Sequence, residues 1–390
     1  MTTRTNFSTI VLGLGGIGSG AAYWLSRRQG DDVLGIEQFP LGHLRGGSED
    51  HSRIIRLSYH TPHYVELAKQ AYAAWEQVEV ESGEPVVLRT GGLDLAPAGG
   101  AIPLADYTDA LTRSGVAYEK LGASEVMRRW PQWRLPDHVE AIYQEKTGLA
   151  MASRANDAHR ALARSNGATL VDNEPVVSIR ESGSEVEVVT ETASYRCASL
   201  VICGGAWTNR SLAHLGVSLP LDVTLEHVVY TIPDMALDFH PTRFPVWIWM
   251  DEPCFYGFPI FGEPAVKTAW DRCGWVTDPD TRSFEPDAET VARIRRFAAE
   301  HLPGSDRGVH LAKNCLYTLT PDRDFILDRV PGTEHVFMAV GAGHAFKFAS
   351  VIGRLLSELA IDGTASFDLS GFEADRAILT EPDPVRSYMV

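Results

Sequence analysis

The N-terminal stretch Ser8-Thr-Ile-Val-Leu-Gly-Leu-Gly-Gly-Ile-Gly-Ser-Gly20 decides the fold, because it joins an apolar strand to a turn with the spacing Gly13-x-Gly15-x-x-Gly18. Glycines in such a turn allow a tight bend, close approach of the backbone to a pyrophosphate, and close packing of the next helix. The N-terminus of that helix attracts phosphate charge. We expect an amphipathic helix through Ala21–Leu25 and a bound dinucleotide, contacted by Gly13, Gly15, Gly16, Ile17 and Gly18.

A second apolar strand, Val33-Leu-Gly-Ile-Glu37, ends in a carboxylate roughly 20 residues beyond the glycines. A carboxylate at this place accepts hydrogen bonds from ribose hydroxyls and disfavours a 2′-phosphorylated nicotinamide cofactor. We expect Glu37, with Gln38 beside it, to contact the cofactor. The alternative is a glycine-rich turn in another α/β fold.

Composition limits the remaining possibilities. The chain has 390 residues, 44% of them hydrophobic, which is enough for two or three domains. Its formal charge of −16 argues against nucleic acid or an anionic membrane as a partner. The sequence shows neither a signal peptide pattern nor an apolar run of about 20 residues, so we expect a cytoplasmic protein. The five cysteines, at 197, 203, 254, 273 and 315, lack CxxC spacing and predict neither a disulfide scaffold nor a metal site.

Hydrophobic periodicity predicts the elements between these landmarks. Helices are expected over 62–80, over 124–130 with Ser124 as the cap, and over 154–167. Strands and turns are expected over 85–100, a hairpin over 185–196, and a β-rich aromatic region over 223–275 that walls a pocket. The buried strand 200–207 ends in glycines and predicts a second approach to the cofactor, contacted by Val176, Gly204, Gly205 and Trp207.

The segment Val336–Lys347 repeats the order of apolar strand, glycine turn and helix start. A helix that begins near Phe346 would direct its positive end at the turn, where it could stabilise negative charge on a reduced flavin. A nicotinamide ring has no such need. The alternative is a second strand-turn-helix unit without a ligand. The cofactor contacts expected here are Gly341, Gly343, His344, Phe346 and Lys347.

Five segments along the chain carry a resemblance to a known family: Ser52–Arg56, Gly205–Trp207, Phe255–Pro259 with Lys267, Cys315–Asp322 and Gly341–Lys347. In their order and spacing they resemble the monomeric sarcosine oxidase and N-methyltryptophan oxidase family, which are FAD-dependent amine oxidases of the D-amino-acid oxidase superfamily. The resemblance covers nearly the whole chain and implies a monomer.

The fold class expected on these grounds is α/β with two interleaved domains. A discontinuous Rossmann-like FAD-binding domain would comprise residues 1–82, 146–220 and 310–390. A substrate domain on a mainly antiparallel sheet would comprise residues 83–145 and 221–309.

The resemblance implies specific roles around the flavin. Cys315 would carry FAD covalently as a thioether to the 8α-methyl carbon, and nearby cations would favour its thiolate. The alternative is a buried free cysteine. Lys267 would promote the reaction of the flavin with oxygen, since a fixed ammonium stabilises charge that appears only during that step. Arg53 and Ser48 would lie beside the flavin.

The resemblance also implies the substrate site. Arg56 and Lys347 match the pair that holds the substrate carboxylate, which explains how an acidic protein captures an anion. Tyr256 and His344 match active-site residues. Each of these residues also has an ordinary structural explanation: a surface salt bridge for Arg56, an exposed helix position for Lys347, a core aromatic for Tyr256 and a solvated turn for His344.

Two departures from the family pattern stand out. Gly47-Ser-Glu-Asp-His-Ser52 places Glu49 and Asp50 where family members have a His-Gly pair. Asp271 stands where the sarcosine-type enzymes have a histidine, four residues after the lysine. We therefore treat Asp271 as a candidate for orienting the amine and not as an assigned base.

The reaction expected is oxidation of a secondary-amine amino acid (EC 1.5.3.-). A hydride equivalent passes from the carbon next to nitrogen to flavin N5, O₂ is reduced to H₂O₂, and the imine is hydrolysed. An alternative on the same fold oxidises a cyclic imino acid or a secondary-metabolite intermediate. More remote alternatives are an NAD-dependent dehydrogenase and a non-catalytic flavin-binding protein.

Overall fold

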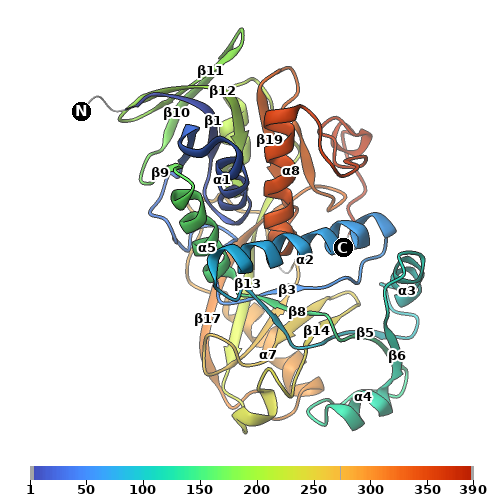
Figure 1. The fold of residues 1–390 in the computed structure, drawn as a ribbon. Helices are drawn as coiled ribbons and strands as arrows, with labels where there is room; N and C mark the ends of the chain where they lie inside the picture. Colours follow the sequence, from blue (N-terminus) through green and yellow to red (C-terminus); the bar gives the residue numbers. More distant parts are fainter. Residues whose placement is uncertain (1–3, 273, 388–390) are drawn as a thin grey trace.

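The computed structural model describes residues 4–272 and 274–387, which are arranged around two large sheets (Figure 1). The first sheet has a parallel core in the order β19-β12-β1-β2-β9, and the antiparallel strands β10, β11 and β18 extend it. Its strands are β1 (Asn6–Leu12), β2 (Val33–Ile36), β9 (Thr169–Val171), β10 (Val176–Ser182), β11 (Glu185–Thr190), β12 (Ser194–Ile202), β18 (Ile326–Arg329) and β19 (Val336–Val340).

The N-terminal strand-turn-helix prediction is confirmed, with one correction. Helix α1 (Gly16–Gln29) begins immediately after the turn, but it is not amphipathic: nearly every residue from Gly18 to Ser26 is buried. Helices α5 (Ala152–Ser165) and α8 (Ala349–Asp362) pack on it and leave it no solvent-facing side over these turns (Figure 1). A helix enclosed in this way is apolar all round.

The second sheet is mainly antiparallel and runs in the order β17-β13-β16-β15-β14-β5-β7-β6, with β14 and β5 parallel. Its edge strand β17 pairs with β13 along its whole length, so the chain leaves this sheet only after Leu319. The domain boundaries themselves stay a prediction. The strands are β5 (Gly92–Pro97), β6 (Glu119–Gly122), β7 (Val139–Gln144), β13 (Asp222–Thr231), β14 (Val246–Trp249), β15 (Phe255–Phe258), β16 (Val266–Trp270) and β17 (Val309–Leu319).

Aromatic side chains of the region 223–275 lie on both faces of this sheet. Side chains alternate along a strand, so Phe255 of β15 stacks on Phe297 of α7 (Ala288–His301) with ring centroids 4.2 Å apart, whereas Tyr256 and Phe258 line a cavity. Trp247 also packs against Phe297. Only part of this region therefore walls a pocket.

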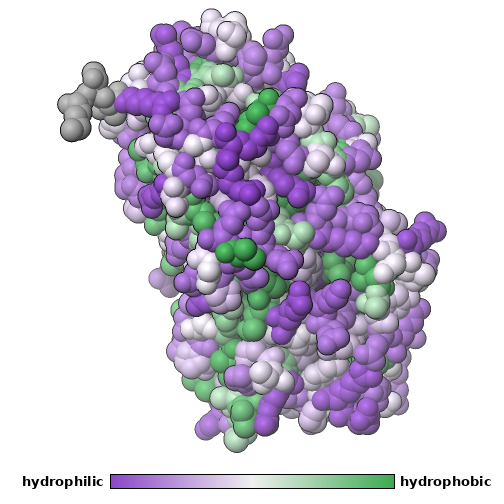
Figure 2. Space-filling view, in the orientation of Figure 1, coloured by the Kyte–Doolittle hydropathy of each residue, from purple (hydrophilic) through white to green (hydrophobic). Residues whose placement is uncertain are grey.

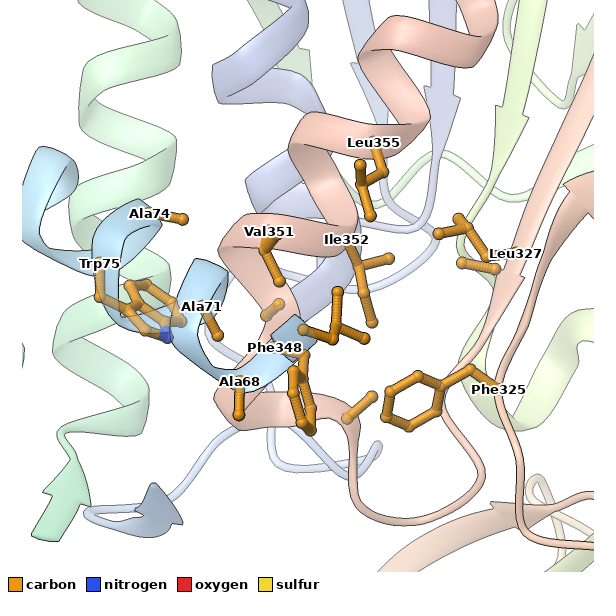
Figure 3. Packing of buried hydrophobic residues seen from close by; sticks show 14 of the residues in the cluster. Ala68, Ala71, Ala74, Trp75, Phe325, Leu327, Phe348, Val351, Ile352 and Leu355 are labelled. Atoms are coloured by element: carbon orange, nitrogen blue, oxygen red, sulfur yellow. The ribbon is translucent and has the colours of Figure 1, made fainter. Parts of the chain in front are cut away.

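Helix α2 (Pro62–Ser82) confirms the helix predicted over 62–80. Its Trp75, Ala71 and Ala68 lie beside Phe348 and Val351 at the start of α8 (Figure 3). The remaining elements are the small sheet of β3 (Arg53–Ile55), β4 (Val87–Arg89) and β8 (Gly148–Ala150), helices α3 (Leu104–Arg113), α4 (Ala123–Arg129) and α6 (Thr208–Ala213), and 3₁₀ turns at Gly30–Asp32, Gly205–Trp207, Ala236–Phe239, Ala345–Phe348 and Ala377–Leu379.

Three local predictions need correction. Ser124 lies in the first turn of α4, whose cap is Gly122, and no side chain caps it. The second arm of the hairpin and the buried strand after it are one strand, β12, which pairs with β11 through its first half and with β19 through its second. The helix expected near Phe346 is a 3₁₀ turn there and becomes α8 at Ala349.

The surface visible in Figure 2 is mostly hydrophilic, with scattered hydrophobic residues. None of the helices within residues 4–272 and 274–387 combines the length and apolar character that crossing a bilayer requires. Within the same ranges the cysteines at 197, 203, 254 and 315 form no disulfide, and position 273 lies outside the described residues.

Candidate functional site

Two joined cavities run between the sheets and bring most predicted site residues together. One follows the first sheet from β2 past the start of α1, and the other lies against the second sheet. The predicted residues that line the first-sheet cavity are Gly13, Gly15, Gly16, Ile17, Glu37, Gln38, Ser48, Val176, Gly204, Gly205, Trp207 and Gly341. Those that line only the second-sheet cavity are Arg53, Arg56, Tyr256, Lys267, Asp271, Cys315, Gly343, His344, Phe346 and Lys347. Both cavities are lined by Gly16, Ile17, Ser48, Gly205 and Gly341.

Gly18 is the predicted contact residue that lines neither cavity. A Cβ at this position would lie 1.8 Å from the carbonyl oxygen of Gly13. Gly13 has φ +83°, a conformation that side chains rarely adopt. Gly18 therefore serves the packing of helix on strand, the third of the glycine roles.

Glu37 closes one end of the first-sheet cavity. Its carboxylate accepts hydrogen bonds from the backbone N–H groups of Leu14 at 2.8 Å and Phe39 at 3.1 Å. Burial alone would raise the pKa of Glu37, but His43 and the backbone donors outweigh it and lower that pKa. The side chain is therefore an ionised acceptor at the place where the sequence predicts a ribose contact.

Cys315 lies on β17 between two other cavity-lining residues, Lys313 and Tyr317, at alternate positions of the strand. Burial raises the pKa of the Cys315 thiol, while Arg53 and Lys267 oppose the shift. The expected cations are present, but desolvation is the larger effect, so the thiol is neutral in this environment. Tyr256 and Tyr317 meet at the same wall, with hydroxyl oxygens 3.3 Å apart.

Lys267 is buried, with 2% of its surface exposed, and is not the solvated strand residue that its neighbours in sequence permit. Its ammonium donates to Asp50 Oδ2 at 2.5 Å and to the carbonyl of Ser52 at 3.0 Å. Arg53 donates to the same Asp50 oxygen at 3.2 Å. Burial lowers the pKa of Lys267 to about 8, while Asp50 raises it.

Arg56 and Lys347 converge although they are 291 positions apart in the chain: the Arg56 guanidinium lies 5.0 Å and the Lys347 ammonium 5.8 Å from the ring centre of Tyr59. Asp94 accepts from Arg56 at 3.2 Å and from the Ser58 hydroxyl. Burial, assisted by Arg56, lowers the pKa of Lys347 well below its usual value.

The turn that carries Lys347 is held by α2, because the indole of Trp75 donates a hydrogen bond of 2.8 Å to the Lys347 carbonyl. Trp75 lies beside the start of α8 (Figure 3). The backbone of Lys347 is thereby tied to a packed aromatic side chain of α2.

Asp271 directly follows β16, lines the same cavity as Lys267 and accepts a hydrogen bond of 2.7 Å from Arg323. Burial would raise the pKa of Asp271, but Arg323, together with Arg272 and Lys347, outweighs it and keeps the carboxylate ionised. His344 contacts the Arg323 carbonyl through Nε2 at 2.8 Å, and burial lowers its pKa well below the usual value. Its imidazole is therefore neutral.

The residues present fit a dinucleotide. The start of α1 lines the first-sheet cavity, where a helix N-terminus attracts phosphate charge and no side chain of Gly13, Gly15 or Gly16 intrudes; the Gly16 N–H itself donates to Ser48 Oγ at 2.9 Å. From there the second-sheet cavity continues to Cys315. An ADP portion would lie between Glu37 and the turn, and a flavin beside Cys315.

Comparison with known proteins agrees with this geometry. The family model for FAD-dependent oxidoreductases matches residues 8–359. This chain belongs to that family. It is 32% identical over 380 residues to a monomeric sarcosine oxidase from Bacillus sp. (strain NS-129), covering 96% of this chain and 98% of the relative. An N-methyl-L-tryptophan oxidase from Salmonella agona (strain SL483) is 29% identical, covering 95% and 99%.

Solved structures show the same fold. NikD, described as an unusual amino acid oxidase essential for nikkomycin biosynthesis, superposes with a TM-score of 0.85 at 24% identity, covering 97% of this chain and 100% of NikD. The expected α/β fold class is confirmed for this FAD-dependent oxidoreductase.

Sequence reasoning missed several residues of this FAD-dependent oxidoreductase. Lys313 shares a strand face with Cys315, so two-residue spacing could have found it. Arg323 directly follows the Thr-Pro-Asp motif. Asp94, behind Arg56, and Tyr230, beside Asp50, have no sequence signal, because their roles depend on contacts 38 and 180 positions away.

Proposed function

We propose that this FAD-dependent oxidoreductase is an oxidase of secondary-amine amino acids of the sarcosine or N-methyl amino acid type, with O₂ as acceptor and H₂O₂ as product. The observation that carries the proposal is the convergence of Arg56 and Lys347 in the cavity that also holds Cys315 and Lys267. The relatives named as sarcosine oxidase and N-methyl-L-tryptophan oxidase support the substrate class. Relatives named monomeric support a monomer.

The substrate carboxylate binds between the Arg56 guanidinium and the Lys347 ammonium. Asp94 forms an ion pair with Arg56 and neutralises its charge. The positive charge that neutralises the substrate carboxylate is therefore the ammonium of Lys347. Asp271, kept ionised by Arg323, orients the amine. The neutral imidazole of His344 adds no positive charge beside that amine.

FAD, when bound, supplies the two-electron acceptor for the amine. Cys315 is the residue that would attach it as a thioether, and Arg53 and Ser48 line the cavity beside it. Lys267 provides a fixed positive charge for the oxygen step. Forming the thioether would break the S–H bond of Cys315 and one C–H bond of the 8α-methyl group, and the two electrons released would pass to the flavin ring and then to O₂. Because burial raises the pKa of the thiol, loss of its proton has to accompany this step.

A second candidate is a cyclic secondary amine or an intermediate of secondary metabolism. The observation that favours it is the Asp271–Arg323 pair. This pair places a carboxylate beside the expected position of the amine, where the resemblance to sarcosine-type enzymes implies a histidine.

A peroxide-coupled screen tests both candidates. Sarcosine, N-methyl aromatic amino acids, proline and pipecolate are each offered to the flavin-loaded enzyme. Peroxide from N-methyl amino acids supports the first candidate, and peroxide from the cyclic amines alone supports the second. Flavin that no secondary amine reduces would overturn both.

A further inference from the structure

Half of the lysines of this chain face one cavity. The second-sheet cavity is lined by Lys267, Lys313 and Lys347, although the chain carries a net charge of −16. Two of these ammonium groups meet at a single carboxylate, Asp50. The six lysines of the chain are Lys69, Lys120, Lys146, Lys267, Lys313 and Lys347.

Asp50 accepts four hydrogen bonds from side chains of four separate segments. Its Oδ2 accepts from Lys267 of β16 at 2.5 Å and from Arg53 of β3 at 3.2 Å. Its Oδ1 accepts from Tyr230 of β13 at 2.9 Å and from Lys313 of β17 at 2.5 Å. Only 4% of the Asp50 side chain is exposed.

We propose that Asp50 is a positioning residue for Lys267, fixing its ammonium in the flavin cavity and keeping it protonated for the oxygen step. The inference rests on the oxygen role of Lys267 given under the proposed function. Asp50 lies in the segment that departs from the family pattern, so this arrangement belongs to this chain and is not implied by the resemblance.

The electrostatics around Lys267 require such a partner. The ammonium is buried, and the two neighbouring cations, Arg53 and Lys313, both disfavour its charge. Asp50 is the acidic group in contact with it, and Tyr230 contributes a neutral hydroxyl. Cys315 faces the same cluster as a neutral thiol. His51, whose ring packs edge-on against Tyr230, is paired on its other side with Glu263 at 2.9 Å.

Asp50 itself stays charged. Burial would raise its pKa, but Lys267, Arg53 and Lys313 outweigh burial and hold that pKa far below the usual range. Three cations around one carboxylate leave a net positive cluster. Without the carboxylate, Lys267 would share a buried site with two cations and no anion, and release of its proton would relieve the repulsion.

The first test measures the charge of Lys267 without using activity. Flavin-loaded protein is labelled with ¹³C at lysine Cε, and the six signals are titrated by NMR, with Lys267→Met identifying its signal. Asp50→Asn should lower the titration midpoint of Lys267 by about one to three pH units, the usual effect of one close opposite charge. An unchanged midpoint would overturn the proposal.

Two further variants separate electrostatics from damage to the fold. Lys313→Met removes a repelling cation and should raise the titration midpoint of Lys267, which is the opposite direction to Asp50→Asn. A midpoint that does not rise would contradict the proposal that the two lysines share Asp50. This test holds even if the Asp50→Asn protein does not fold. Asp306→Asn is the matched control, since the Asp306 side chain is 5% exposed, pairs with Arg295 at 2.7 Å and lines neither cavity. It should leave the midpoint unchanged.

The second test measures reoxidation of reduced flavin by O₂ in stopped flow. Asp50→Asn should slow reoxidation and move its pH dependence to lower pH, and should have no further effect in a Lys267→Met background. If Lys267→Met itself leaves reoxidation unchanged, the oxygen role of Lys267 fails. If only Asp50→Asn leaves it unchanged, the positioning role fails while the proposed function stands.

Discussion

Arg323 and Asp271 form a buried ion pair in the wall of the second-sheet cavity, with a guanidinium nitrogen 2.7 Å from the carboxylate and 2% of the Arg323 side chain exposed. The pair joins the loop after β17 to the residue that follows β16. It also fixes His344, which contacts the Arg323 carbonyl. One arginine thus keeps a carboxylate ionised in this cavity through its side chain and holds the imidazole of His344 through its carbonyl.

We expect Asp271→Asn to destabilise the protein, because it leaves the buried Arg323 without its anion. Loss of one partner of a buried pair costs about 3–5 kcal/mol. Chemical denaturation monitored by flavin and tryptophan fluorescence measures the loss. The double variant Asp271→Asn/Arg323→Met should recover much of it, since no charge is then left unpaired. Equal stability of the single and double variants would contradict this account.

Cys315→Ser should release the flavin from the polypeptide. Serine keeps the size of the side chain but does not form the thioether, so acid precipitation should leave the yellow colour in the supernatant. In the unsubstituted protein the colour should stay in the pellet. Cys254→Ser is the matched control, since Cys254 lines the same cavity and should leave attachment intact. Colour in the supernatant of the unsubstituted protein would reject covalent attachment.

Reoxidation of the reduced flavin should slow as pH rises through about 8. The folded protein lowers the pKa of Lys267 to about 8, chiefly by burial, so the ammonium is present below that pH and lost above it. Stopped-flow mixing with O₂ across pH 6 to 10 measures the profile. Lys267→Met should slow reoxidation far more than reduction by substrate and should abolish this pH dependence. A variant that slows both half-reactions equally would show that Lys267 acts elsewhere.

Carboxylate binding should weaken with rising pH. Burial and Arg56 lower the pKa of Lys347, so above that pKa the free protein must take up a proton to bind an anion. The dissociation constant of propionate, which lacks an amine, should then rise by up to about tenfold per pH unit. Flavin absorbance changes on titration provide the measurement.

Two substitutions check that this linkage belongs to the proposed carboxylate site. Lys347→Met should weaken propionate binding and remove its pH dependence, because the titrating ammonium is gone. Arg56→Met should weaken binding while the pH dependence persists. Unchanged affinity in both variants would move the carboxylate site elsewhere.

Local sequence determined the nucleotide-binding half of this protein. A strand, a glycine turn, a helix and a terminal acid are set by backbone conformation and spacing within about 30 residues, so Gly13, Gly18 and Glu37 could be assigned roles before any contact was known. Hydrophobic periodicity, also a local signal, predicted α2, and the resemblance carried by Cys315 and Lys347 led to the prediction that the flavin lies beside them.

Tertiary structure alone decided which side chains carry charge in the second-sheet cavity. Whether Lys267 is a solvated strand residue or a buried cation depends on Asp50, which lies 217 positions away. Arg323 acquires its partner across 52 positions, and α1 has no exposed face from Gly18 to Ser26 because α5 and α8 cover it. Burial and ion pairing arise only when distant segments of the chain come together. Desolvation then makes their effect on the charge of a side chain much larger than the effect of its neighbours in sequence.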